Sequence, residues 1–206
     1  MSSMPMSGVP LGPERRGTRL RGGETWWDNG VVEGQLDALT GFRNRDAWDE
    51  AITRGDEARF KQPLTTSVVF LDVDYPGRAD ETPAPALGDQ IRQSVAGIVR
   101  EVIRADDLIA RTGDDEFGVL LPGADETACA NVVRRLRDKF AYASLPDGRQ
   151  LSVAVGSATA ASNETLTKAQ RWADARMFFE KNDPRRAKPL DRRPSAIVVD
   201  ISARGR

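Results

Sequence analysis

Two groups of acidic residues have the types and spacing that could support chemistry. Asp72 and Asp74 close the apolar run 67–74 (SVVFLDVD), and an acidic triplet occupies positions 114–116 (DDE) between two shorter apolar runs. Carboxylates at the carboxyl end of a buried strand lie at the crevice where α/β folds bind ligands. Hard oxygen ligands in two neighbouring loops suit Mg²⁺ together with a nucleoside triphosphate. Each group taken alone is more simply explained as solvated turn residues.

The amino-acid composition excludes several kinds of catalytic site. The 206 residues include no His and one Cys, Cys129. Ser-His and Cys-His nucleophile pairs, histidine zinc sites and the usual general base near neutral pH are therefore absent. Acid, base or metal chemistry must fall to carboxylates. Cys129 lies in an alanine-rich helical pattern, so we expect a core residue in a reducing compartment.

The charge balance and the apolar patterning restrict the partners. Lys and Arg number 30 against 31 Asp and Glu, a net charge of −1, which argues against bulk binding of nucleic acid. No apolar run approaches the roughly 20 residues of a membrane helix. Residues 1–13 also lack the apolar stretch of a signal peptide. We therefore expect a cytoplasmic protein with no membrane partner.

Polar ends enclose a single predicted domain. We expect a disordered basic N-terminal tail over 1–34, a domain over 35–186 and a C-terminal tail over 187–206. The first tail is rich in Ser, Pro, Gly and Arg, a composition that cannot bury enough apolar surface to order itself. The Trp26-Trp27 pair could dock on the domain or on a partner. The apolar run 196–201 could add an edge strand or remain part of the tail.

Alternating helical and strand patterns between these ends would position the acidic groups. Hydrophobic periodicity predicts helices at 43–55, 88–103, 125–141 and 165–181, and strands at 67–74, 108–111, 116–121 and 151–158. The TGDD sequence at 112–115 predicts a hairpin turn. This order of elements predicts an α/β (α+β) domain with a ferredoxin-like, split βαβ central sheet flanked by helices.

The segment 104–117 (RADDLIARTGDDEF) strongly resembles the signature of GGDEF-type diguanylate cyclases. It includes the Arg-x-x-Asp product-inhibition motif, here Arg104 and Asp107. Other segments resemble further motifs of that family in the same order, namely 37–45 (DALTGFRNR), 117–123 (FGVLLPG), 151–156 (LSVAVG) and 172–181 (WADARMFFEK). The likeness covers residues 37 to 185 and implies a nucleotidyl-cyclase-like GGDEF fold.

The resemblance implies chemistry in which two GTP molecules are joined into cyclic di-GMP, a bacterial second messenger. It assigns Mg²⁺, with Mn²⁺ possible, to the side chains of Asp72 and Asp115 and the carbonyl of Val73. It makes Asp115 and Glu116 the catalytic residues, with Glu116 as a further acidic group beside the metal. The metal would neutralise charge on the triphosphate and help to activate the ribose 3′-hydroxyl.

The remaining assignments concern the substrate and the product, and each has a simpler structural alternative. Asp89 would read the guanine edge, or would be a helix N-cap. Lys181 and Arg185, four residues apart, would share a helix face and hold the outer phosphates, or would only balance a helix C-terminus. Arg104 and Asp107 would bind cyclic di-GMP, or would form a surface ion pair. Asp80 and Gly113 complete the implied substrate site.

Three departures from the family pattern predict impaired activity. The second glycine of the signature is Asp114, whose tolerance of left-handed turns predicts that the hairpin survives. The sequence 75–77 (YPG) replaces an aromatic residue, Phe and Lys, and Asp80 replaces a guanine-reading Asn. Each lost charge-assisted phosphate contact costs about 1.5–3 kcal/mol.

Three functional hypotheses follow from the sequence. The first is a diguanylate cyclase, which would need a homodimer or a partner protein because two domains must present one GTP each. The second is a degenerate domain that senses cyclic di-GMP or GTP through the Arg104 and Asp107 site. The third is an interaction module whose nucleotide sites are relics.

Overall fold

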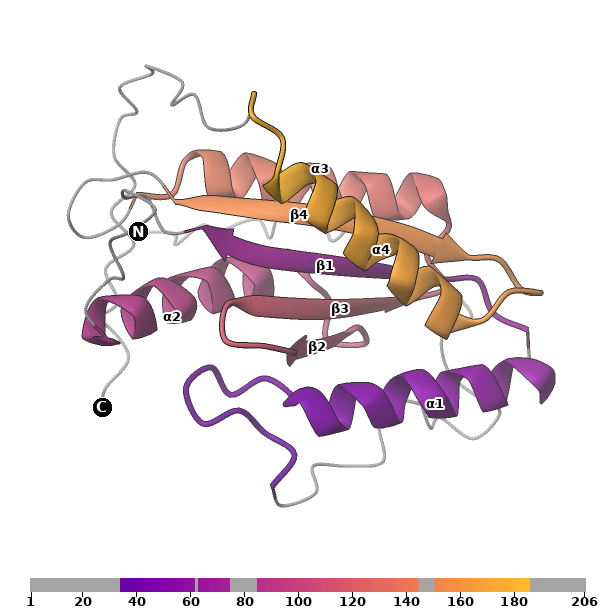
Figure 1. Ribbon diagram of the computed structural model, residues 1–206. Coiled ribbons are helices and arrows are strands. Elements are labelled where there is room, and N and C mark those ends of the chain that lie inside the picture. Colours follow the sequence, from indigo (N-terminus) through magenta and orange to yellow (C-terminus); the bar gives the residue numbers. More distant parts are fainter. Residues whose placement is uncertain (1–33, 62, 75–84, 145–150, 186–206) are drawn as a thin grey trace, which may run out of the picture.

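Helices and strands alternate along the chain in the computed structural model, which describes residues 34–61, 63–74, 85–144 and 151–185. The elements are α1 (Arg45–Lys61), β1 (Thr66–Asp74), α2 (Pro85–Val102), β2 (Leu108–Arg111), β3 (Glu116–Pro122), α3 (Glu126–Ala141), β4 (Ser152–Ala160) and α4 (Leu166–Lys181). Figure 1 shows them as a sheet with helices on both faces. None of the helices in the described part of the chain combines the length and hydropathy of a membrane span.

The four strands form one sheet in the order β2-β3-β1-β4, and each neighbouring pair is antiparallel. This is the split βαβ arrangement that the sequence predicts. The central strand β1 is buried on both faces, which explains why its residues are almost continuously apolar. Val69 and Leu71 pack in one core cluster, and Val68 and Phe70 pack in the other.

The two core clusters define which helices cover which face. One cluster joins the sheet to α2 and α3, and it includes Cys129 as the sequence predicts. The other joins the sheet to α1 and α4. A residue of β1 therefore faces either the α2 side or the α4 side according to its parity in the strand. This division determines which helix can reach each acidic residue at the strand end.

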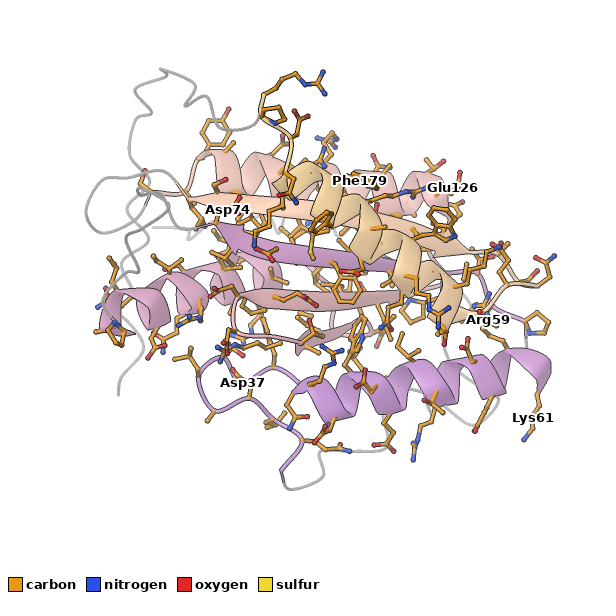
Figure 2. The ribbon with its side chains drawn as sticks, viewed as in Figure 1. Asp37, Arg59, Lys61, Asp74, Glu126 and Phe179 are labelled. Atoms are coloured by element: carbon orange, nitrogen blue, oxygen red, sulfur yellow. The ribbon has the colours of Figure 1, made fainter. Side chains whose placement is uncertain are left out.

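Element boundaries differ from the predictions mainly in α1 and α2. Helix α1 continues past Gly55 to Lys61, because the buried Arg59 donates hydrogen bonds to the backbone carbonyls of Leu64, Ala160, Ala161 and Glu164. These contacts outweigh the modest cost of a glycine inside a helix. Figure 2 shows Arg59 at the opposite end of the sheet from Asp74. The predictions for residues 1–33, including the Trp26-Trp27 pair, and for 187–206 lie outside the described residues.

Helix α2 begins at Pro85, three residues before the predicted start at Gly88. Proline suits the first position of a helix because its missing N–H would lack a helical partner there anyway. Asp89 consequently lies inside the helix, so the alternative interpretation of Asp89 as an N-cap is wrong. Asp125 and Thr165 do cap α3 and α4, each accepting a hydrogen bond from the backbone three residues later.

Gly156 lets α4 lie directly against β4. A Cβ atom at this position would clash with the backbone of Ala173 and would lie 2.8 Å from the Cα of Met177. Backbone atoms cannot rotate away as a flexible side chain can, so only glycine permits this approach. The close packing fixes the position of α4, whose last residue is Lys181.

We therefore predict that Gly156→Ala lowers the free energy of unfolding by about 3 kcal/mol or more, because overpacking here has to displace a helix. Urea unfolding measures the change. Gly97→Ala is the matched control, since a Cβ there meets no atom within 4 Å. That control should gain about 0.5–1 kcal/mol, because alanine favours the helix. Equal stability of the two variants would contradict the account of this packing.

Candidate functional site

Pairing of β1 with β3 brings the two acidic groups of the sequence together. Asp72 lies opposite Glu116 in the antiparallel register, so their side chains share one face of the sheet. One residue further, the backbone N–H of Val73 donates to the carbonyl of Asp115 at 2.9 Å. The carboxyl end of β1 therefore meets the start of β3 at one edge of the domain.

Asp72 is held by a lysine from α4. The Nζ atom of Lys181 lies 2.7 Å from Oδ1 of Asp72, whose side chain is 15% exposed. Burial raises the pKa of Asp72 above its usual 3.8, and the charges of Asp74 and Asp115 raise it further, while the bond from Lys181 opposes the shift. Three carboxylates thus act on one another at this end of the sheet.

Asp115 is held by an arginine from α2, on the other face of the sheet. Nε of Arg92 donates to Oδ1 of Asp115 at 2.9 Å, and another nitrogen of the same guanidinium donates to Oδ1 of Asp89 at 3.0 Å. One cation therefore bridges the residue assigned to the metal and the residue assigned to guanine. The resemblance gives Arg92 no role, although its position three residues after Asp89 on a helix is a signal for such a pair.

The carboxylates have the donor chemistry of a magnesium site, because Mg²⁺ binds through oxygen ligands. Asp72 and Asp115 interact electrostatically, and each already forms an ion pair, Asp72 with Lys181 and Asp115 with Arg92. Among the residues whose placement is described, however, no three acidic or other ligating side chains converge on one point. The two cations draw the carboxylates toward opposite faces of the sheet.

The signature turn adopts a backbone that does not require its second glycine. Within the described ranges, no residue other than glycine has a positive φ, so Asp114 is not left-handed, and β2 and β3 pair as the predicted hairpin. The turn is instead held through the Asp114 carbonyl, which accepts hydrogen bonds of 2.9 Å from both Arg92 and Arg111. Glu116 accepts a hydrogen bond from the Thr112 hydroxyl at 2.7 Å. Gly113 packs closely on Glu116, since a Cβ there would lie 3.2 Å from that side chain.

Asp37 anchors the N-terminal motif to this turn. Its carboxylate accepts from the N–H and hydroxyl of Thr40 at 2.9 and 2.7 Å, and from Arg111 at 2.9 Å. Burial alone would raise the pKa of Asp37, but these hydrogen bonds outweigh it and the pKa is lowered. Figure 2 shows Asp37 on the same side of the molecule as Asp74. The resemblance gives this aspartate no role, although an Asp with Thr-Gly beginning three residues later is a signal for a turn capped by the side chain.

The structure does not bring the other predicted residues to the acidic site. Helix α4 ends at Lys181, with Asn182 as its cap, because Pro184 disfavours helical geometry in the residue before it. Arg185 therefore lies beyond the helix and pairs with Asp183 at 2.9 Å, so the prediction that it shares a helix face with Lys181 is wrong. Asp80 and the 75–77 sequence lie outside the described residues.

Arg104 and Asp107 form a turn just before β2. The Asp107 carboxylate accepts from the backbone N–H of Arg104 at 3.2 Å, and the Asp107 N–H donates to the Arg104 carbonyl at 3.1 Å. The contact to Asp107 is thus made by the backbone of Arg104, whose side chain is exposed. The turn therefore fixes the backbone of Arg104, and the guanidinium lies outside the core.

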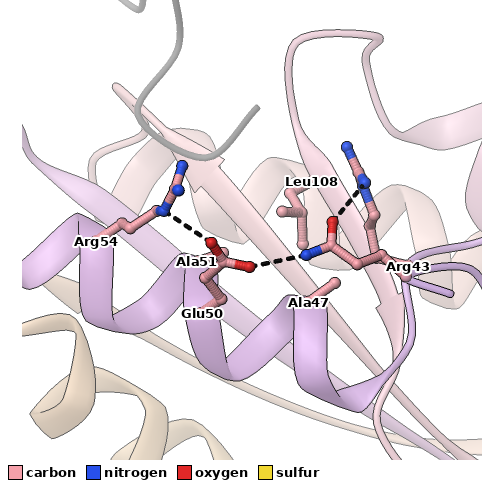
Figure 3. Close-up of a pocket in the computed structure, with 7 residues that line it drawn as sticks. Arg43, Ala47, Glu50, Ala51, Arg54 and Leu108 are labelled. Carbon is pink, nitrogen blue, oxygen red and sulfur yellow. Dashed lines mark hydrogen bonds and ion pairs between the residues drawn. The ribbon is translucent and has the colours of Figure 1, made fainter. Parts of the chain in front are cut away.

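Two cavities of the described structure lie away from the acidic site. One of about 10 Å³, room for about one water molecule, is lined by Gln35, Arg43, Glu50, Arg54 and their neighbours. Figure 3 shows that these four side chains are linked to one another by hydrogen bonds and an ion pair. A larger cavity of about 540 Å³ lies between α2 and α3 beside Ile98, Lys139 and Tyr142. Neither contains an acidic residue assigned to nucleotide or metal.

Comparison with known proteins identifies this arrangement. The family model described as "Diguanylate cyclase, GGDEF domain" matches residues 34–187. The chain belongs to the GGDEF diguanylate cyclase domain family. Its match covers all eight elements of the structure, so both the resemblance and the fold class predicted from the sequence are confirmed.

Curated relatives match the GGDEF-type domain over part of their length. The probable diguanylate cyclase DgcT of Escherichia coli is 33% identical over 102 residues, which are 50% of this chain and 22% of that protein. The cyclic di-GMP phosphodiesterase NbdA of Pseudomonas aeruginosa is 32% identical over 117 residues, 57% of this chain and 15% of NbdA. The chain thus spans about a fifth of the length of these relatives.

Solved structures share the fold. The GGDEF domain of DgcB from Caulobacter crescentus, in complex with cyclic di-GMP, superposes with a TM-score of 0.65 at 23% identity, covering 74% of this chain and 90% of that one. Diguanylate cyclase SiaD from Pseudomonas aeruginosa, in complex with its activator SiaC, superposes with a TM-score of 0.64 at 26% identity. The match covers 72% of this chain and 58% of the SiaD chain. These matches support the four-stranded antiparallel sheet with flanking helices.

The raised pKa of Asp72 predicts a pH dependence of stability. Between the usual value of 3.8 and the raised value, the folded chain binds more protons than the unfolded chain, so this group makes stability fall as pH rises. Asparagine does not ionise, so Asp72→Asn removes this pH-dependent loss of stability. The free energy of unfolding of the variant, relative to the original chain, should increase from about pH 4 to pH 7 in urea titrations.

Asp37→Asn is the control for this prediction. The lowered pKa of Asp37 means that its stabilisation is present above 3.8 and is lost as pH falls below that value. The loss of unfolding free energy caused by Asp37→Asn should therefore stay nearly constant between about pH 4 and pH 7, the range over which Asp72→Asn becomes more stable relative to the original chain. A relative stability of Asp72→Asn that decreases with rising pH would contradict the assignment.

Proposed function

We propose that this domain is a diguanylate cyclase that joins two GTP molecules into cyclic di-GMP, with reduced activity. The observation that carries the proposal is the meeting of Asp72 with Asp115 and Glu116 at the end of the β1 and β3 pair. Lys181 lies beside them on α4. Membership of the GGDEF family supports the chemistry for which these acids would be used.

In this proposal Mg²⁺, or Mn²⁺ in its place, is held by the side chains of Asp72 and Asp115 and by the Val73 carbonyl. The bound ion would neutralise charge on the triphosphate and help to activate the ribose 3′-hydroxyl. Lys181 would move from Asp72 to the outer phosphates, where an ammonium acts as a compact charge. Glu116 would lie beside that metal ion as a further acidic group.

Substrate recognition and alignment follow from the same placement. Asp89 on α2 is linked to Asp115 by the guanidinium of Arg92. Its carboxylate would accept hydrogen bonds from the guanine edge. Asp80, Gly113 and Arg185 complete the proposed contacts, and Arg185 would have to leave Asp183 to reach a phosphate. A second domain must supply the other GTP, so the active form would be a homodimer or a complex with a partner protein. The SiaD complex with its activator SiaC illustrates the second arrangement.

A product assay tests the cyclase proposal. Purified protein with GTP and Mg²⁺ should form cyclic di-GMP, and Asp115→Asn should lower the rate at least about 100-fold, as expected when a group that stabilises transition-state charge is lost. Arg134→Gln, which removes only an exposed ion pair on α3, should retain the rate. Product formation that survives in Asp115→Asn would contradict the assignment.

A second candidate function is sensing of cyclic di-GMP or GTP without turnover. Two observations favour it, namely the pairing of both carboxylates with cations and the exposed Arg104 on a turn built by Asp107. An arginine can hold a phosphate through two parallel hydrogen bonds and can stack on a base. The solved GGDEF domain of DgcB is described in complex with cyclic di-GMP.

Calorimetric titration with cyclic di-GMP tests this candidate. Arg104→Ala should weaken binding by about tenfold or more, the loss of one charge-assisted contact. Arg134→Ala provides a control with the same change of charge on a neighbouring helix. Binding by the original chain without product formation would favour the sensor, whereas equal binding by Arg104→Ala would exclude this site.

A further inference from the structure

Arg92 lies at the centre of the proposed nucleotide site and was not assigned by sequence. It follows Asp89 by one helical turn in α2, and its side chain is 18% exposed. The structure gives the guanidinium hydrogen bonds to the Asp89 carboxylate, the Asp115 carboxylate and the Asp114 carbonyl, at 3.0, 2.9 and 2.9 Å. Two of these three acceptors are carboxylates that the proposed function gives to a ligand.

The guanidinium is fitted to this position. A Cβ atom at Gly88 would lie 3.1 Å from a terminal nitrogen of Arg92, so the side chain packs against the glycine that precedes Asp89. Arginine stays protonated at every pH at which proteins fold. Its hydrogen bonds to carboxylates are charge-assisted, and partial burial strengthens them. The contacts of Arg92 are therefore stronger than those of an ordinary surface ion pair.

The signature turn does not depend on Arg92 alone. Arg111 also donates to the Asp114 carbonyl at 2.9 Å and is anchored by Asp37. Arg45 of α1 donates to the neighbouring Thr112 carbonyl at 2.9 Å. The turn thus keeps its position if Arg92 is replaced, so a change in ligand binding can be separated from a change in the fold.

We propose that Arg92 is an internal competitor for the nucleotide site, whose guanidinium occupies the acceptors that the metal ion and the base require. A guanidinium bonded to Asp115 neutralises the charge that would attract a divalent ion, and the two cations would repel each other beside the same carboxylate. The bond from Arg92 to Asp89 likewise competes with a hydrogen bond from a base edge. This inference rests on the proposed function and adds that Arg92 lowers the affinity for the metal-bound nucleotide.

Binding of a GTP analogue that cannot be cleaved at its α-phosphate, measured by calorimetry with Mg²⁺ on the full chain, tests the proposal. Arg92→Gln should bind the analogue about tenfold more tightly, because one set of competing charge-assisted bonds is lost. Arg92→Lys keeps the charge but loses the planar guanidinium with its several fixed donors, so the affinity of this variant should lie between those of the original chain and of Arg92→Gln. Arg134→Gln, with the same loss of charge on α3, should bind as the original chain does.

A second substitution identifies the acid through which Arg92 acts. In a chain that carries Asp115→Asn, adding Arg92→Gln should give no gain in affinity over Asp115→Asn alone, because the carboxylate for which Arg92 competes is already absent. Thermal unfolding shows that each variant is folded, and Arg92→Lys decides the test if Arg92→Gln unfolds.

The outcomes separate this inference from the proposed function. If the original chain binds the analogue and the Arg92 variants bind it equally or more weakly, the competition is refuted and the nucleotide site stands. If neither the original chain nor any Arg92 variant binds it, the nucleotide site is refuted and the competition with it.

Discussion

Negative charge gathers where β1 and β3 meet, and the cations that balance it come from helices on opposite faces of the sheet. Lys181 at the end of α4 reaches Asp72, while Arg92 on α2 reaches Asp115 and Asp89. Carboxylates this close in a half-buried place need counter-cations, because their mutual repulsion is weakly screened. The fold holds these cations in place because it fixes the positions of the two helices. The close contact of α4 with Gly156 is one example of this packing.

The same charge balance links the two proposed functions. A site whose carboxylates are already neutralised binds a metal-bound nucleotide only by displacing its own cations. Under the proposed function, turnover would then be slow while the fold remains intact. The turn around Arg104 and Asp107 is separate from these pairs. If cyclic di-GMP binds at that turn, as proposed, neither Lys181 nor Arg92 would have to move.

Local patterns in the sequence predict most of the fold. The apolar run before Asp72 predicts a strand buried on both faces, and the TGDD sequence at 112–115 predicts the hairpin between β2 and β3. The pairing of charges could not be predicted in this way. Arg92 lies over twenty residues from Asp115, and their contact depends on the packing of α2 against the sheet. The end of α1 likewise depends on carbonyls about a hundred residues distant that bind Arg59.

A crystal structure of the protein with Mg²⁺ and an uncleavable GTP analogue would test the central claim most directly. The account predicts a metal ion bound by both Asp72 and Asp115, with the Lys181–Asp72 and Arg92–Asp115 pairs broken and Lys181 turned to the phosphates. A nucleotide bound with both ion pairs intact, or a metal ion bound at a place that includes neither aspartate, would contradict it.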